Sequence, residues 1–73
     1  MEFEKICEII ADKQDVDVSV IAMETTLESL GIDSLTMVEI VMDIEEAFDI
    51  TFKNDELKTV GQVVEYVQSL LNA

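Results

Sequence analysis

Apolar residues recur at helical spacing in three separate stretches of the chain. They predict a first helix over residues 2–13, a second over residues 34–48 and a last one from residue 60 onwards. The three stripes are Phe3, Ile6, Cys7 and Ile10; Met37, Ile40, Val41, Ile44, Ala47 and Phe48; and Val60, Val63, Val64, Val67 and Leu71, with Leu70 on the flank. Because each helix has one apolar side, we expect all three to pack around one core.

The first connection, residues 14–33, is long and carries a weaker signal. Valines at positions 16, 18 and 20 alternate with polar residues as in a β-strand, but no second strand pattern exists to pair with them. We therefore expect an ordered loop, with Leu27, Leu30 and Ile32 pinning it to the core.

Two capping signals precede the last helix. Asn54 could cap a short helical turn over residues 55–58, and Thr59 and Gln62 have the spacing of a capping box. The predicted fold class is therefore all-α, a small bundle of three main helices plus one short helix before the last. At this length we expect residues 1–73 to form a single domain.

The charge balance restricts the possible partners. The chain has 4 basic and 17 acidic residues, a net charge of −13. Nucleic acid and anionic membrane surfaces would be repelled, because both bind through Lys and Arg. Basic surfaces on other proteins are favoured, since opposite charge speeds their encounter.

Targeting signals are missing from the sequence. The N-terminus, "MEFEKICEII", has acidic residues where a signal peptide has basic ones, and no stretch approaches the roughly 20 apolar residues of a membrane span. The single cysteine, Cys7, lies inside the first apolar stripe and is compatible with a reducing compartment. We expect a cytoplasmic monomer.

No defined metal site is expected, whereas loose cation binding by the charge-dense surface stays open. The chain has no histidine, which excludes a Cys2His2-type zinc site. Asp15, Asp17 and Ser19 have the spacing of the first calcium ligands of an EF-hand. Val20 and Thr26, however, stand where that loop requires glycine and glutamate.

Ser34, at the start of the second helix, is a candidate nucleophile. It lacks the Gly-x-Ser-x-Gly elbow of hydrolases, and no histidine is present to act as its base. The chain is therefore not expected to be an enzyme. From the residues alone, Ser34 is interpreted as a helix N-cap.

The second helix has a second face with an unusual composition. At about 100° per residue, three apolar and three acidic side chains fall opposite the core stripe. We call these six residues the docking face: Leu35, Val38, Met42, Glu39, Glu45 and Glu46. The glutamates prevent burial of this side in the core, so it predicts a surface for a partner with an apolar groove and a basic rim. The competing interpretation is a chance grouping of exposed apolar residues.

The segment "GIDSLTMVEIVMDIEEAFDI" resembles an acyl carrier protein. The family's Asp-Ser-Leu motif is matched by Asp33, Ser34 and Leu35, and "VEIVMDIEEAFDI" resembles the acidic recognition helix that follows it. Residues 59–67, "TVGQVVEYV", resemble the start of the family's last helix. The likeness covers the whole chain in size, helix order, acidity and placement of motifs.

This resemblance implies a cofactor and a set of partners. A holo-carrier synthase (phosphopantetheinyl transferase) would transfer 4′-phosphopantetheine from coenzyme A to Ser34, with Asp33 and Leu35 flanking the attachment site. The arm's thiol would hold acyl chains as thioesters and present them to fatty acid synthesis enzymes with basic docking patches. The glutamates of the docking face match family positions that meet basic residues, and its apolar residues match the family's apolar contacts.

Two departures from the family pattern leave the pathway open. Thr36 stands where the family often has an acidic residue, and "TFKNDELK" replaces a stretch that commonly reads Ile-Pro-Asp-Glu. Phe52 stands for that isoleucine and is predicted to bind partners, while Lys53 adds a positive charge. The alternatives are a carrier for a specialised polyketide or peptide pathway and an unmodified acidic adaptor that binds basic proteins.

Overall fold

The computed structural model describes residues 2–53 and 56–72 of the chain. Its elements are α1 (Glu2–Gln14), the 3-10 helices η1 (Val18–Val20) and η2 (Glu28–Leu30), α2 (Ser34–Phe48) and α3 (Val60–Leu71). The all-α class and the three main helices are confirmed. The short helix predicted over residues 55–58 begins outside the described residues, as does its proposed cap Asn54, and residues 56–58 are not helical.

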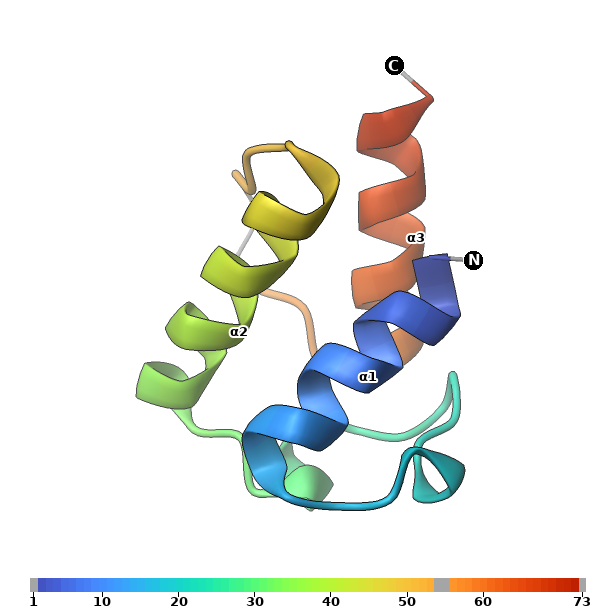
Figure 1. Cartoon of the computed structure of the whole chain (residues 1–73), viewed down its shortest axis with the longest axis vertical. Coiled ribbons are helices and arrows are strands. Elements are labelled where there is room, and N and C mark those ends of the chain that lie inside the picture. Colours follow the sequence, from blue (N-terminus) through green and yellow to red (C-terminus); the bar gives the residue numbers. More distant parts are fainter. Residues whose placement is uncertain (1, 54–55, 73) are drawn as a thin grey trace.

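The helix α1 joins the other two helices into one bundle. In Figure 1, α1 descends diagonally across the view, whereas α2 and α3 both ascend on either side of it. It packs against both α2 and α3. The first two helices thus run in roughly opposite directions and cross obliquely (Figure 1).

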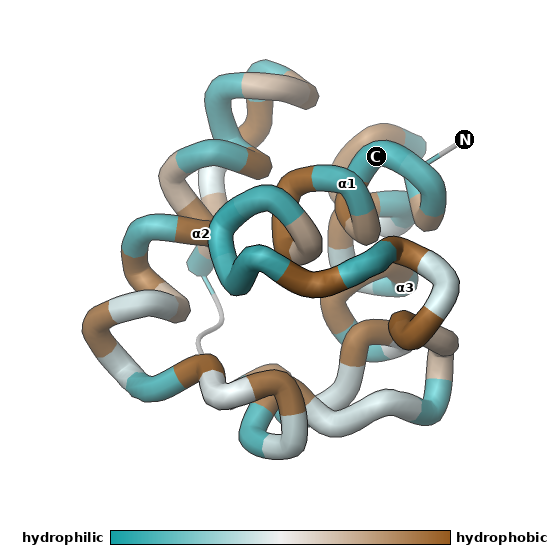
Figure 2. Tube along the Cα trace, turned by 60° about the horizontal axis from the view of Figure 1, so that its bottom comes forward, coloured by the Kyte–Doolittle hydropathy of each residue, from teal (hydrophilic) through white to brown (hydrophobic). Residues whose placement is uncertain are grey.

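The core is built from the predicted stripes. Figure 2 shows apolar segments recurring along the helices between hydrophilic ones. The fully buried side chains include Ile6, Ile10, Ile40, Ile44, Val60, Val63, Val64 and Val67. Cys7 is buried with them, and this burial raises the pKa of its thiol.

Two members of the predicted stripes are exposed. Ala47 lines an open groove between α1 and α2, which the oblique crossing of α1 leaves uncovered. Leu71 is 41% exposed because it lies one turn beyond Val67, the last fully buried residue of α3.

The long connection between α1 and α2 is an ordered loop, as predicted. Its valine alternation does not form a strand; residues 18–20 form η1, whose cap is Asp17. The Asp17 carboxylate accepts the Ser19 N–H at 2.9 Å, and this hydrogen bond holds the pKa of Asp17 below its ordinary value. Leu27 and Ile32 are buried as predicted, Leu30 is half-buried, and Ile21 is a further buried anchor.

The same loop is hydrogen-bonded to the segment that enters α3, a pairing that the sequence pattern did not reveal. The Leu27 N–H donates to the Lys58 carbonyl at 2.9 Å, and the Val60 N–H donates to the Thr25 carbonyl at 2.9 Å. The Gly61 N–H donates to the Met23 carbonyl at 2.7 Å. These bonds fix the start of α3 against the loop.

The predicted capping box of α3 is confirmed. The Gln62 N–H donates to the Thr59 hydroxyl at 3.1 Å, and the Thr59 N–H donates to the Gln62 side chain at 3.2 Å. Both otherwise unpaired donors at the helix start are therefore satisfied.

Candidate functional site

The cap of α2 is Asp33 rather than Ser34, which corrects the interpretation from sequence. Asp33 has an extended backbone, and its Oδ1 accepts the Thr36 N–H at 2.8 Å. This bond holds the pKa of the Asp33 carboxyl below its ordinary value. Aspartate and serine are equally good caps, so the sequence alone did not distinguish these neighbours.

Ser34 is the first residue of α2 and is exposed. Within the described part of the chain its hydroxyl makes no hydrogen bond, so it is not held in a structural role. It lies where the unpaired backbone N–H groups and the positive end of the helix dipole favour an anionic group. An approaching phosphate would meet an accessible oxygen in a favourable field.

The turn that leads to Ser34 is fixed by contacts from α1. Gly31 adopts a left-handed conformation, with φ of 78°, which glycine permits without strain. Just before it, the Leu30 carbonyl accepts a 2.8 Å hydrogen bond from the Gln14 side-chain amide at the end of α1. Ile32 is buried on the other side of the turn. Ser34 is thus presented by a rigid segment.

A groove of about 430 Å³ opens beside Ser34. Its lining residues are Thr26, Leu27, Glu28, Ile32, Asp33, Ser34, Met37, Leu57 and Lys58. The apolar members could contact the alkyl part of a flexible arm, and Lys58 is the basic residue of a lining that also holds the acidic Glu28 and Asp33. The residues present therefore fit a phosphodiester-linked group at this serine.

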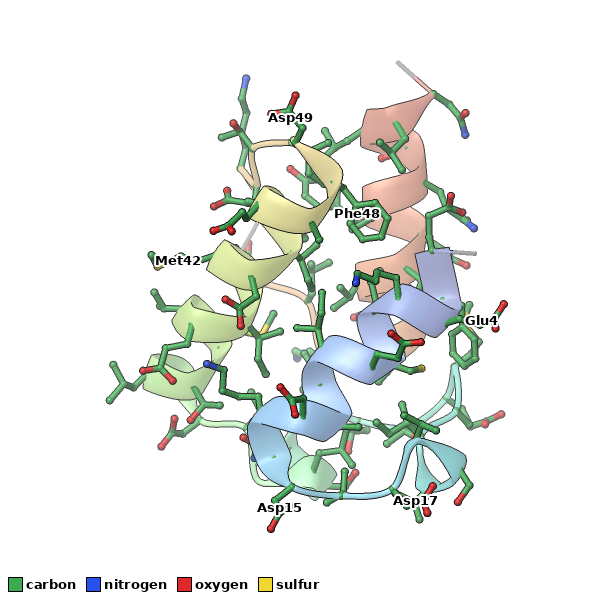
Figure 3. All side chains as sticks on the ribbon, in the orientation of Figure 1. Glu4, Asp15, Asp17, Met42, Phe48 and Asp49 are labelled. Atoms are coloured by element: carbon green, nitrogen blue, oxygen red, sulfur yellow. The ribbon has the colours of Figure 1, made fainter. Side chains whose placement is uncertain are left out.

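The docking face is exposed in the structure. Its apolar members Leu35, Val38 and Met42 are 70%, 55% and 60% exposed. Figure 3 shows the Met42 side chain pointing away from the bundle, whereas Phe48 on the opposite side of α2 points inward. Glu39 and Glu46 are also exposed, but Glu45 is only half-exposed.

A basic residue from α1 borders the docking face. The helical pattern of α2 could not predict this contact. The Lys13 ammonium lies 3.5 Å from the Asp43 carboxylate and 3.9 Å from the Glu39 carboxylate. It therefore offsets part of the negative charge along α2 and ties α1 to that helix.

The segment after α2 is held close to the docking face. The Phe52 N–H donates to Glu45 Oε2 at 2.7 Å, and the Lys53 N–H donates to the Tyr66 hydroxyl of α3 at 2.9 Å. The Phe52 ring meets the Tyr66 ring edge-on, with centroids 5.1 Å apart and planes at 74°. Phe52, predicted as a partner contact, is half-buried between the two helices' side chains.

The described residues offer neither a metal-ligand cluster nor a membrane-spanning helix. Among residues 2–53 and 56–72, no group of three or more His, Cys, Asp or Glu side chains is placed to hold a metal ion. No described helix is long and apolar enough to cross a membrane.

Comparison with known proteins identifies the family. The family described as "Phosphopantetheine attachment site" matches residues 4–67. An acyl carrier protein of Clostridium acetobutylicum is 42% identical over 73 residues, covering 94% of this chain and 95% of the relative. The chain belongs to the acyl carrier protein family. A second acyl carrier protein, from Clostridium perfringens, is 45% identical over 69 residues, with 89% and 91% coverage.

The fold agrees with this membership. The crystal structure of an acyl carrier protein from Thermotoga maritima superposes with a TM-score of 0.82 at 25% identity, covering 99% of this chain and 93% of that one. Acyl carrier proteins are carriers and not enzymes, and the group they carry is phosphopantetheine. Their partners are the synthase that installs this group and acyl-processing enzymes.

Proposed function

We propose that residues 1–73 act as one carrier domain whose Ser34 bears 4′-phosphopantetheine as a phosphodiester. The observation that carries this proposal is the exposed Ser34 hydroxyl at the first position of α2, beside an apolar groove with Lys58 at its edge. Asp33 orients the helix start, and Leu35 follows as an exposed contact. When bound, the arm supplies a thiol on which acyl chains travel as thioesters.

The docking face is the surface on which partners bind. We assign apolar contacts to Leu35, Val38, Met42 and Phe52, and charge contacts to Glu39 and Glu46; Glu45 belongs to the same face. The exposure of the three apolar side chains beside exposed carboxylates supports this assignment. A holo-carrier synthase and acyl-processing enzymes with basic rims would fit it, because charge steers the encounter and apolar burial holds the complex.

Fatty acid synthesis is the pathway we favour. The net charge of −13 and the Asp33-Ser34-Leu35 motif support this choice over a specialised polyketide or peptide pathway. We propose that the carrier acts in the cytoplasm as a monomer. The buried free thiol of Cys7 suits such a reducing compartment.

The attachment site can be tested with purified protein, coenzyme A and a holo-carrier synthase. Wild-type protein should gain one phosphopantetheine, and Ser34→Ala should gain none. Ser34→Ala should remain folded because the Asp33 cap is intact. Ser29→Ala is the matched control, since Ser29 is another exposed serine before α2. Modification of Ser34→Ala would mean that another residue carries the group, and modification of no variant by several synthases would favour the unmodified adaptor.

The docking assignment has a separate test in the same reaction. Glu39→Lys and Glu46→Lys should lower kcat/KM more at low salt than at high salt, because exposed charges are screened. Val38→Ala should lower it with little dependence on salt. Glu65→Lys, an exposed charge reversal on α3, serves as the control. Equal behaviour of all four variants would mean that the docking face does not bind the synthase.

A further inference from the structure

We propose that Glu45 is a positioning residue of the docking face, which fixes Phe52 as the far wall of an apolar groove, rather than a charge that partners contact directly. The inference rests on the proposed function of this face. It assigns to Glu45 a task different from that of Glu39 and Glu46, although all three are acidic residues on the same side of α2.

The geometry at Glu45 separates it from the other two glutamates. Its Oε2 accepts the Phe52 N–H at 2.7 Å across seven residues of chain, in a part-buried setting. Glu39 and Glu46 are exposed, whereas Glu45 is half-buried. A half-buried carboxylate whose Oε2 accepts a short hydrogen bond from the Phe52 N–H is held in one orientation, so that only Oε1 remains for a partner's lysine or arginine.

Among the described residues, hydrogen bonds to Glu45 tie the segment after α2 to that helix. The helix ends at Asp49, which adopts a left-handed conformation with φ of 56°, and the chain then turns back along the helix. The Ile50 N–H still bonds to the Glu45 carbonyl at 3.1 Å. Beyond that point, among the described residues, the Phe52 N–H donates to the Glu45 side chain and holds the segment against α2. Glu45 thus anchors this turn through both its main chain and its side chain.

The opposite side of the segment is anchored to α3. The Lys53 N–H donates to the Tyr66 hydroxyl at 2.9 Å, and the Tyr66 ring packs edge-on against Phe52. Two adjacent backbone N–H groups therefore have acceptors on two different helices. These two hydrogen bonds fix the backbone at residues 52 and 53, and the fixed backbone sets the position and direction of the Phe52 side chain.

The consequence is a groove that extends the docking face. It has a volume of about 370 Å³ and is lined by Met37, Val38, Val41, Met42, Glu45, Phe52 and Lys53. Its α2 side includes the exposed apolar residues Val38 and Met42, and Phe52 and Lys53 form the other side. An apolar side chain from a partner enzyme that lies on Val38 and Met42 would meet Phe52 at a separation set by Glu45.

The test compares variants that keep or remove the acceptor. Glu45→Gln retains a side-chain oxygen that can accept the Phe52 N–H but loses the charge, whereas Glu45→Ala loses both. Glu46→Gln is the matched control, because it removes an exposed charge that makes no such bond. We would measure hydrogen exchange of the Phe52 amide by NMR, and kcat and KM of modification by a holo-carrier synthase at low and high salt.

The positioning role predicts a particular order of effects. Phe52 amide exchange should be about tenfold faster in Glu45→Ala, the effect of losing one charge-assisted hydrogen bond, and close to wild type in Glu45→Gln and Glu46→Gln. Glu45→Ala should raise KM at both salt concentrations, and Glu45→Gln should restore most of that loss. Glu46→Gln should instead show a loss that shrinks at high salt.

The inference would be overturned if Glu45→Gln lost as much kcat/KM as Glu45→Ala with the salt dependence of Glu46→Gln, since Glu45 would then act as an external charge. Unchanged Phe52 exchange in Glu45→Ala would overturn it as well. A failure of wild-type protein to be modified at all is a different result: it would refute the proposed function, and the inference with it.

Discussion

Replacing Gly61 with alanine should destabilise the protein, although the same change in an ordinary helix interior would stabilise it. Gly61 is buried in the first turn of α3, where its N–H donates to the Met23 carbonyl at 2.7 Å. A Cβ atom at Gly61 would lie 2.8 Å from that carbonyl oxygen. The obstacle is backbone, so it cannot move aside as a flexible side chain would.

The expected magnitude follows from three contributions. Overpacking of a tight site costs about 1–3 kcal/mol, and weakening the hydrogen bond to Met23 costs about 0.5–1.5 kcal/mol more. The better helix propensity of alanine offsets about 0.5–1 kcal/mol. The net loss should be about 0.5–4 kcal/mol, and a loss of about 2 kcal/mol would lower the Tm of a domain of this size by roughly 8–16 °C.

Urea denaturation and thermal melting followed by circular dichroism would measure this change. The control is Gly31→Asn, because asparagine tolerates the left-handed φ of 78° and a Cβ at Gly31 would approach only the Gln14 side chain, at 3.5 Å. We expect this control to lose about 1 kcal/mol, the low end of the cost of a non-glycine residue at a left-handed φ. An unchanged or increased stability of Gly61→Ala would refute the close approach between α3 and the Met23 segment.

Three further predictions concern charged residues. Asp49→Asn should raise the free energy of unfolding, measured in urea, by about 0.3–1 kcal/mol. Asparagine tolerates the φ of 56°, and the change removes a carboxylate from the negative end of α2. An unchanged free energy of unfolding would contradict an unfavourable effect of this charge. Lys13→Gln should lower the Tm more at low salt than at high salt, because it removes the cation 3.5 Å from Asp43; a salt-independent loss would point to packing instead. The Asp33 cap lowers the pKa of its carboxyl, so its stabilisation should be present above the unfolded pKa of about 3.9 and be lost as pH falls through the folded pKa. A Tm series from neutral pH to about pH 3 should therefore decline less steeply in Asp33→Asn, and parallel declines would exclude this contribution.

The helices were predictable because their stability depends on periodic burial. Apolar spacing placed α1, α2 and α3 to within one residue of their observed starts, and Thr59 gave the start of α3 through its capping box. The start of α2 was correct as a position, but Asp33 and not Ser34 is its cap, because two adjacent residues had the same capping ability.

The connections were less predictable because backbone hydrogen bonds leave no periodic trace. Nothing in the spacing of apolar residues indicates that the Met23 carbonyl meets Gly61, or that the valines near residue 18 form a 3-10 turn instead of a strand. A buried glycine at the start of a helix indicates a close backbone contact only when the segment that faces it is known.

The candidate site was likewise predictable only in part. The exposed face of α2 followed from helical geometry, and the exposure of Val38 and Met42 agrees with that prediction. The half-buried state of Glu45 did not follow, because it depends on the chain after α2 folding back to place the Phe52 N–H against the carboxylate. Glutamates on one helix face have the same chemistry, so only their tertiary neighbours distinguish their roles.

The central claim, that Ser34 bears the phosphopantetheine arm, is tested most directly by top-down mass spectrometry of the intact protein after reaction with coenzyme A and a holo-carrier synthase. Fragmentation of the backbone on both sides of residue 34 assigns the added mass to a single position. We expect one phosphopantetheine on every modified molecule, located at Ser34. An added group at another serine or threonine, or protein that keeps its unmodified mass with several synthases, would contradict this claim.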